Sequence, residues 1–277
     1  MRAAVLQLTC GDDPASNLPV TLSLIRDAVA VGAEFVLTPE VTNCVSASRA
    51  QQMAVLQNEA EDQTLAALRE VARECGIWLL IGSLALKTDD SDGRFANRSF
   101  LITPEGKVAA RYDKIHMFDV TISDTESYRE SAGYRPGGAA VLAPMPFGAL
   151  GLTICYDLRF PHLYRQLAQA GAQVLSVPSA FSPVTGAAHW ETLLRARAIE
   201  TGCYVLAPAQ TGTHEATQGK PRQTYGHALA VAPWGEVIAD AGTDPGFVLA
   251  DLDMDAVASA RQRIPALTHD RVFRGPA

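Results

Sequence analysis

The chain has 277 residues, of which 48% are hydrophobic, and its formal net charge is −7. A chain of this length and apolar content can bury a large core as one α/β domain. The negative charge disfavours a nucleic-acid-binding surface and binding to anionic membranes. We therefore expect a single domain over residues 1–277, with neither nucleic acid nor membrane as a partner.

The cysteine content predicts a reduced, intracellular protein. The cysteines are odd in number and widely spaced, and no C-x-x-C pair occurs, which is typical of structural thiols. Segment 1–8 becomes polar too early for a signal peptide and is typical of a first strand. These features predict a cytoplasmic location. The cysteines are Cys10, Cys44, Cys75, Cys155 and Cys203.

Strand-like and helix-like patterns alternate in the first half of the chain. The expected strands are 2–8, 34–38 and 77–86, and the expected helices are 17–31 and 62–75. Segments 94–103 and 107–112 flank Pro104-Glu105-Gly106, which predicts a hairpin.

The second half continues this alternation. Strands are expected at 140–142, 149–154, 173–177, 203–207 and 247–252, with helices at 161–170, 187–201 and 253–262. Segments 227–231 and 236–240 are expected to pair around Pro233-Trp234-Gly235. Hairpins within such a pattern predict α/β layers and argue against a purely parallel, doubly wound sheet. The tail, about 264–277, is expected to be irregular.

Two long stretches, 136–156 and 170–190, contain no Asp, Glu, Lys or Arg. Their length would suit membrane spans, but prolines and glycines interrupt both of them. We interpret them as buried strands joined by turns, because strands covered on both faces are apolar throughout.

Cys155 ends an apolar strand and is followed by a short turn and by Pro161, which suits the first turn of a helix. A cysteine at such a corner can present its thiol for nucleophilic attack, while the amide of Tyr156 can hold a developing oxyanion. Taken alone, the segment favours a buried structural cysteine.

Two further side chains follow expected strands. Glu40 comes directly after an apolar strand, where α/β proteins place active sites, and Lys114 follows the second arm of the hairpin at 94–112. Alone, each is typical of a solvated surface side chain. Together with Cys155 they supply a thiol, a carboxylate that can take its proton and an ammonium that can lower its pKa. This set favours nucleophilic catalysis without a metal.

Other chemistries have less support. The six histidines lie at no metal-ligand spacing, and neither a Walker motif nor G-x-G-x-x-G occurs, so no metal and no cofactor are expected. A Cys155–His162 pair remains an alternative on the residues alone, but it would leave Glu40 and Lys114 without a role.

The segments 38–40, 112–116 and 154–161 together resemble the nitrilase superfamily of carbon–nitrogen hydrolases, in the order in which that family carries them. The resemblance runs nearly end to end. It implies that Glu40 is the general base and acid, Lys114 the oxyanion cation and Cys155 the nucleophile. It also implies a second active-site glutamate at Glu130, with Glu126 as the nearby alternative.

The resemblance implies a four-layer α-β-β-α sandwich. Two such subunits would pair into an eight-layer homodimer across the helices at 161–170 and 187–201. Within the superfamily the chain resembles the small amidases related to deaminated glutathione amidase and omega-amidase. Segments 188–200, 209–210, 225–227 and 233–236 favour the first, whereas Gly138 stands where an acidic residue is commoner.

The expected reaction is hydrolysis of a small carboxylate-bearing amide to an acid and ammonia or an amine, through a Cys155 thioester. Arg159 is the expected clamp for the carboxylate, with a structural ion pair to Asp157 as the alternative. Ala180 and Phe181 are expected to line the rim of the site. Omega-amidase activity on α-keto acid amides, nitrilase activity on C≡N and a non-catalytic binding homologue remain alternatives.

Overall fold

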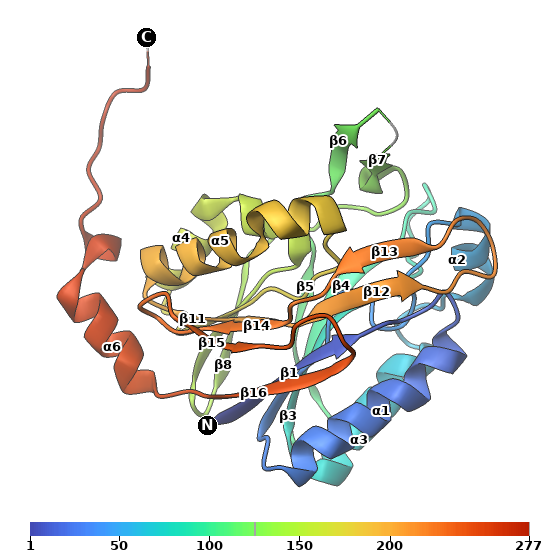
Figure 1. Ribbon diagram of the computed structural model, residues 1–277, viewed down its shortest axis with the longest axis horizontal. Coiled ribbons are helices and arrows are strands. Elements are labelled where there is room, and N and C mark those ends of the chain that lie inside the picture. Colours follow the sequence, from blue (N-terminus) through green and yellow to red (C-terminus); the bar gives the residue numbers. More distant parts are fainter. Residues whose placement is uncertain (125, 277) are drawn as a thin grey trace.

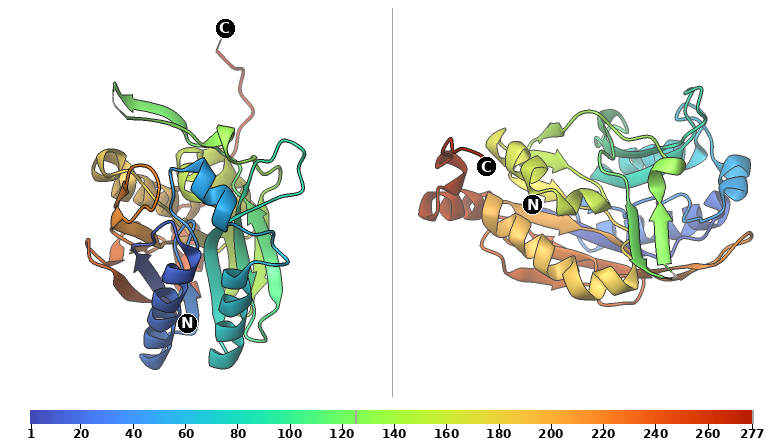
Figure 2. Two further views of the ribbon diagram at one scale, coloured as in Figure 1. Left: turned by 90° about the vertical axis from the view of Figure 1, so that its right-hand side faces the viewer. Right: turned by 90° about the horizontal axis from the view of Figure 1, so that it is seen from above.

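The computed structural model describes residues 1–124 and 126–276. Two large sheets face each other, and helices cover the outer face of each (Figures 1 and 2). The expected four-layer α-β-β-α sandwich is confirmed. Pairing of two subunits stays a prediction.

The first sheet contains both the first and the last strand of the chain, β1 and β16. It has eight strands in the order β13-β12-β1-β2-β3-β4-β5, and β16 also pairs with β1. Strand β1 is parallel to β2 and β12 and antiparallel to β16, so the sheet is mixed as the hairpins indicated. The strands are β1 (Arg2–Leu8), β2 (Phe35–Leu37), β3 (Trp78–Leu86), β4 (Ala96–Ile102), β5 (Val108–Asp113), β12 (Ala209–His214), β13 (Arg222–Tyr225) and β16 (Gly246–Asp251).

The second sheet has six strands in the order β15-β14-β11-β10-β9-β8. Its centre, β9-β10-β11, is parallel, and the outer pairs are antiparallel. Its strands are β8 (Val141–Met145), β9 (Gly148–Leu152), β10 (Val174–Ser176), β11 (Tyr204–Ala207), β14 (Leu229–Val231) and β15 (Val237–Asp240). A separate hairpin, β6 (Asp119–Ser123) with β7 (Glu126–Arg129), projects from the body in both figures.

The alternation of side chains along β1 explains the layering. Ala4 and Leu6 pack in one cluster with helices α1 (Pro14–Ala30) and α3 (Gln63–Cys75), whereas Ala3 and Val5 join the core between the sheets. Successive side chains of a strand point to opposite faces, so one apolar strand serves both layers. The remaining helices are α2 (Arg49–Val55), α4 (Pro161–Gln169), α5 (Pro183–Thr201) and α6 (Met254–Arg263), and the 3₁₀ turns are η1 (Glu130–Ala132), η2 (Cys155–Arg159) and η3 (Ala266–Thr268).

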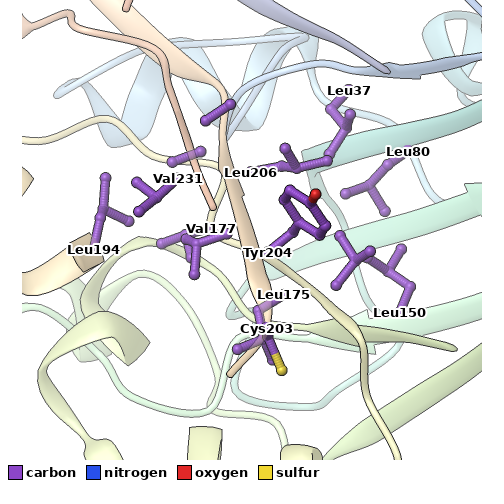
Figure 3. Packing of buried hydrophobic residues seen from close by; sticks show 14 of the residues in the cluster. Leu37, Leu80, Leu150, Leu175, Val177, Leu194, Cys203, Tyr204, Leu206 and Val231 are labelled. Carbon is purple, nitrogen blue, oxygen red and sulfur yellow. The ribbon is translucent and has the colours of Figure 1, made fainter. Parts of the chain in front are cut away.

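The core between the sheets is made of aliphatic side chains from both. Figure 3 shows Leu37 and Leu80 of the first sheet facing Leu150 and Leu206 of the second. All four are fully buried. Burying a leucine side chain contributes about 1.5–3 kcal/mol, so this layer fixes the two sheets, and the strand ends beside it, relative to each other.

Helix caps correct two expected boundaries. Helix α1 begins at Pro14 rather than at 17, because the Asp13 side chain accepts from the Ala15 amide. Helix α5 begins at Pro183 rather than at 187, after the Ser182 N-cap. The end of the uncharged stretch 170–190 is therefore helical, not a turn between strands.

The other expected strands and helices, including both hairpins, are confirmed, and their boundaries differ from the expected ones by at most three residues. Strand β9, however, ends at Leu152, and Cys155 opens a 3₁₀ turn. Helix α2 and the strands β6, β7, β12 and β13 were not predicted. After η3 the tail is irregular to 276, and the last predicted position, Ala277, lies outside the described residues.

Candidate active site

Three side chains from different strands converge at one end of the two sheets. Glu40 follows β2, Lys114 follows β5 and Cys155 follows β9. Lys114 Nζ donates to Glu40 Oε1 at 2.9 Å, and Cys155 lies close enough for the Glu40 charge to raise the pKa of its thiol. All three are buried, with 4%, 2% and 7% of their surface exposed. The structure therefore brings together the three residues singled out in the sequence.

Glu130 joins them at the start of η1. Lys114 Nζ donates to its Oε1 at 2.9 Å and to its Oε2 at 2.8 Å, and the Phe118 amide donates to Oε2 at 2.6 Å. The alternative, Glu126, instead accepts from the Tyr128 hydroxyl within the β6–β7 hairpin. We refer to Glu40, Lys114, Glu130 and Cys155 as the central cluster.

Two polar side chains that the sequence analysis missed hold Glu40. Asn97 Nδ2 donates to Glu40 Oε1 at 2.9 Å, and Gln210 Nε2 donates to the Glu40 carbonyl at 3.0 Å. The Ala180 amide donates to Glu40 Oε2 at 2.9 Å. Both amides are buried, but β12 reads Ala-Gln-Thr-Gly-Thr-His and β4 begins Ala-Asn-Arg-Ser, so no apolar pattern marked either residue in the sequence.

The backbone at Cys155 is strained. Its φ is +49°, a left-handed conformation that costs a non-glycine residue about 1–3 kcal/mol. The Cys155 amide donates to the Pro178 carbonyl at 3.0 Å, and the Ile154 amide donates to Asp157 Oδ2 at 2.9 Å. These bonds hold the corner that carries the thiol.

Asp157 ties this corner to the segment carrying Lys114. It is fully buried, and its carboxylate accepts from the Tyr112 hydroxyl at 2.7 Å and the His116 amide at 3.0 Å. The His116 ring lies 2.7 Å from the same carboxylate. The Asp157 carboxylate thus fixes Tyr112 and His116, on either side of Lys114, and Ile154, directly before Cys155.

The electrostatics leave the thiol protonated. Burial and the negative charge of Glu40 raise the pKa of Cys155, and the charge of Lys114, which lowers it as expected, does not compensate. Burial would raise the pKa of Glu40, but the charge and hydrogen bond of Lys114 bring it below its usual value. Burial opposes charge on Lys114, but Glu130 and Glu40 raise its pKa well above the usual value. The resting site is a neutral thiol beside a carboxylate and an ammonium.

A cavity of about 580 Å³ opens onto the central cluster. Tyr156, Ala180 and Phe181 line it, as expected. Much of its remaining lining comes from 41–52, 127–134 and Arg222, which belong to or flank elements that the sequence analysis missed. We refer to α2, the β6–β7 hairpin and β13 as the cavity wall.

Two residues considered in the sequence lie apart from the lining. Arg159 is not among the residues around this cavity; its guanidinium contacts His189 Nδ1 at 3.2 Å and lies 5.6 Å from the Phe181 ring centroid. His162 packs its ring against His116 and Phe160, so it does not support the alternative pairing with Cys155.

Among residues 1–124 and 126–276, no group of three or more His, Cys, Asp or Glu could hold a metal ion. No helix in that part of the chain has the length and apolar character needed to span a membrane.

Comparisons with known proteins agree on one family. Residues 2–262 match the family model described as carbon-nitrogen hydrolase. A deaminated glutathione amidase from Synechocystis is 42% identical over 282 residues, which cover 98% of each chain. Among solved structures, yeast Nit3, a nitrilase-superfamily member, superimposes with a TM-score of 0.85 at 29% identity over 99% of this chain and 97% of its own. The C. elegans NitFhit protein superimposes with a TM-score of 0.89 at 37% identity; the match covers 98% of this chain and 65% of that longer chain.

Proposed function

Because the chain belongs to the carbon-nitrogen hydrolase family, we propose that it is a thiol-dependent amidase whose nucleophile is Cys155. The observation that carries the proposal is the convergence of Cys155, Lys114 and Glu40 as buried residues that line one cavity, with Lys114 Nζ donating to the Glu40 carboxylate. A nucleophile, a base and a fixed cation in one cluster are the parts that acyl transfer needs.

Acylation begins when Glu40 takes the proton of the Cys155 thiol as sulfur attacks the amide carbon. The C–S bond forms, and the carbonyl π electrons become an oxyanion held by Lys114 Nζ and the Tyr156 amide. Glu40 then gives the proton to the leaving nitrogen, the C–N bond breaks and an amine or ammonia departs. The acyl group remains as a thioester.

Deacylation uses the same groups. A water gives a proton to Glu40 as its oxygen attacks the thioester, and collapse of the adduct breaks the C–S bond. The proton returns to sulfur, which regenerates the neutral thiol. Glu130 contacts no reacting atom; it holds Lys114 in place through two hydrogen bonds.

The proposed substrate is a small amide that carries a carboxylate, as in deaminated glutathione. The similarity to deaminated glutathione amidases supports this class, and so do the arginines that line the cavity. An omega-amidase acting on α-ketoglutaramate would use the same acyl group, and a nitrilase would use the same nucleophile.

We propose one catalytic domain over residues 1–277, acting as a homodimer in the cytoplasm. The family model, which spans residues 2–262, supports the single domain. The five free thiols support a reducing compartment. Sedimentation velocity of the purified protein measures the subunit number, and a monomer at micromolar concentration would contradict the dimer.

The test is a comparison of three compounds with one acyl skeleton. Deaminated glutathione and α-ketoglutaramate both yield 2-oxoglutarate, which a coupled dehydrogenase measures, and 4-cyanobutanoate tests for attack on C≡N. Cys155→Ala is the blank. Faster release of 2-oxoglutarate from deaminated glutathione than from α-ketoglutaramate supports the proposal. The reverse order moves the substrate to the omega-amidase class. Release of ammonia from the nitrile, with no hydrolysis of either amide, contradicts an amidase.

A further inference from the structure

Resting on the proposed function, we propose that Arg222 binds the carboxylate of the substrate's acyl half and that the Ala180 backbone links this contact to Glu40. Arg222 opens β13 in the cavity wall and lines the cavity above the central cluster. Arg222, far along the chain from Cys155, thus takes the role that the sequence suggested for Arg159.

Arg222 keeps donors available. Its Nη2 donates to the Ala180 carbonyl at 2.7 Å, which fixes the guanidinium in place. Its Nε is buried and has no hydrogen-bond partner. Among the described residues, no ion pair includes Arg222. A buried donor without a partner costs free energy, and a carboxylate bound by two parallel N–H groups would remove that cost.

The other arginines of the cavity are already engaged. Arg49 donates from Nη1 to the Gly133 carbonyl and from Nη2 to the Gly93 carbonyl, and its guanidinium lies 3.7 Å from the Phe95 ring centroid. Arg129 is exposed and donates to the Tyr128 carbonyl. Arg222 is therefore the lining arginine with a buried donor that has no partner.

The Ala180 residue connects the two ends of the site. Its amide donates to Glu40 Oε2 at 2.9 Å, and its carbonyl accepts from Arg222 at 2.7 Å. The charge of Arg222 also favours the carboxylate form of Glu40, which lowers the pKa of Glu40. When a substrate carboxylate neutralises Arg222, that influence weakens and Glu40 becomes a stronger base. Binding of the correct substrate would thus activate the base.

The experiment compares two amides of equal chain length. Glutaramate carries a carboxylate on its acyl half, and pentanamide carries a methyl group there. We expect Arg222→Gln to lower kcat/KM for glutaramate about 10- to 100-fold, mainly through KM, and to lower it less for pentanamide, so that the preference for the carboxylate falls. Arg222→Lys keeps the charge and should lie between. Arg159→Gln removes a charge outside the cavity and should affect both amides in equal proportion.

A second readout tests the link to Glu40. The acid limb of the pH profile with pentanamide should move to higher pH in Arg222→Gln, because the charge that lowers the pKa of Glu40 is gone. A merely structural role for Arg222 would lower the rate without this shift. An unchanged limb would overturn the link.

A third readout does not depend on turnover. Glutarate should protect Cys155 from iodoacetamide in the native enzyme, and Arg222→Gln should need at least tenfold more glutarate for the same protection. If glutarate protects neither protein, or both equally, the Arg222 assignment is wrong. If the native enzyme hydrolyses neither amide but glutarate protects it through Arg222, the assignment holds and the proposed amidase function fails instead.

Discussion

The central cluster and the cavity wall meet in one cavity but are built in opposite ways. Glu40 follows the fully buried strand β2, and Glu40, Lys114 and Cys155 are themselves buried, with Lys114 only 2% exposed. The β6–β7 hairpin, by contrast, alternates exposed and half-buried residues, and β13 is an edge strand. Elements with few buried contacts open at low free energy. The difference indicates that the reacting groups are held rigidly, whereas the elements that contact the substrate can change conformation at low free energy.

Cys155→Ala tests the cluster most strongly. We expect turnover to fall about 10⁴-fold or more, because the thiol that forms the thioester is gone. The midpoint of thermal unfolding should stay within a few degrees of the native value, since the substitution removes only one sulfur atom and leaves the backbone conformation at position 155 unchanged. Residual turnover within tenfold of the native enzyme would disprove the nucleophile.

Lys114→Met should affect both rate and stability. Loss of an oxyanion donor costs about 10²–10³ in kcat, and removing one partner of a buried ion pair costs about 3–5 kcal/mol. Here two carboxylates, Glu40 and Glu130, would lose their cation. Urea unfolding and kcat together measure the effect. A variant as stable as the native protein would show that the cluster does not depend on this charge.

Glu130→Gln and Glu126→Gln form a matched pair that separates cluster from wall. We expect about a 30-fold loss of kcat for Glu130→Gln, because the amide holds Lys114 with one oxygen instead of two. Glu126→Gln changes only a contact with the Tyr128 hydroxyl and should cost less than threefold. The reverse ranking of the two variants would contradict the placement of the second glutamate.

The wall should be the part that acid weakens first. His214, fully buried, lies between the Cys10 carbonyl and the Thr224 hydroxyl of β13, at 2.7 Å from each. Burial lowers its pKa to about 4. The unfolded chain takes up a proton near pH 6.5, so the stability held by neutral His214 is present above that pH and falls as the pH drops towards 4.

By pH 5 this loss amounts to about 2 kcal/mol. Urea unfolding at pH 7.5 and pH 5 should show it in the native protein and less of it in His214→Gln, whose amide cannot be protonated in this range. His269→Gln, in the irregular tail, is the control. Equal pH dependence in all three proteins would contradict a neutral, buried His214.

The sequence identified Glu40 and Cys155 because each of them follows a short apolar strand. Glu40 and Cys155 stand out against Phe35–Leu37 and Gly148–Leu152. The fold class followed from the same alternation of strands and helices. These signals are local, and hydrophobic burial enforces them.

The wall gave no such signal. Helix α2 has seven residues, and β13 reads Arg-Gln-Thr-Tyr, so neither carries an apolar face that a periodicity search detects. Their stability comes from strand pairing and from contacts with distant segments. Arg159 was favoured because it is near Cys155 in the chain, whereas Arg222 reaches the cavity only because β13 pairs with β12. Proximity of that kind depends on the tertiary fold.

Strand β1 has a consequence for how the protein is made. Its partners β12 and β16 lie far along the chain and leave the ribosome long after β1. During that interval β1 is an apolar strand with one edge open, which is a state prone to intermolecular pairing. Chaperone capture of nascent chains should therefore depend on the apolar residues of β1, and a chain halted before Gly246–Asp251 should aggregate instead of folding as a shorter domain.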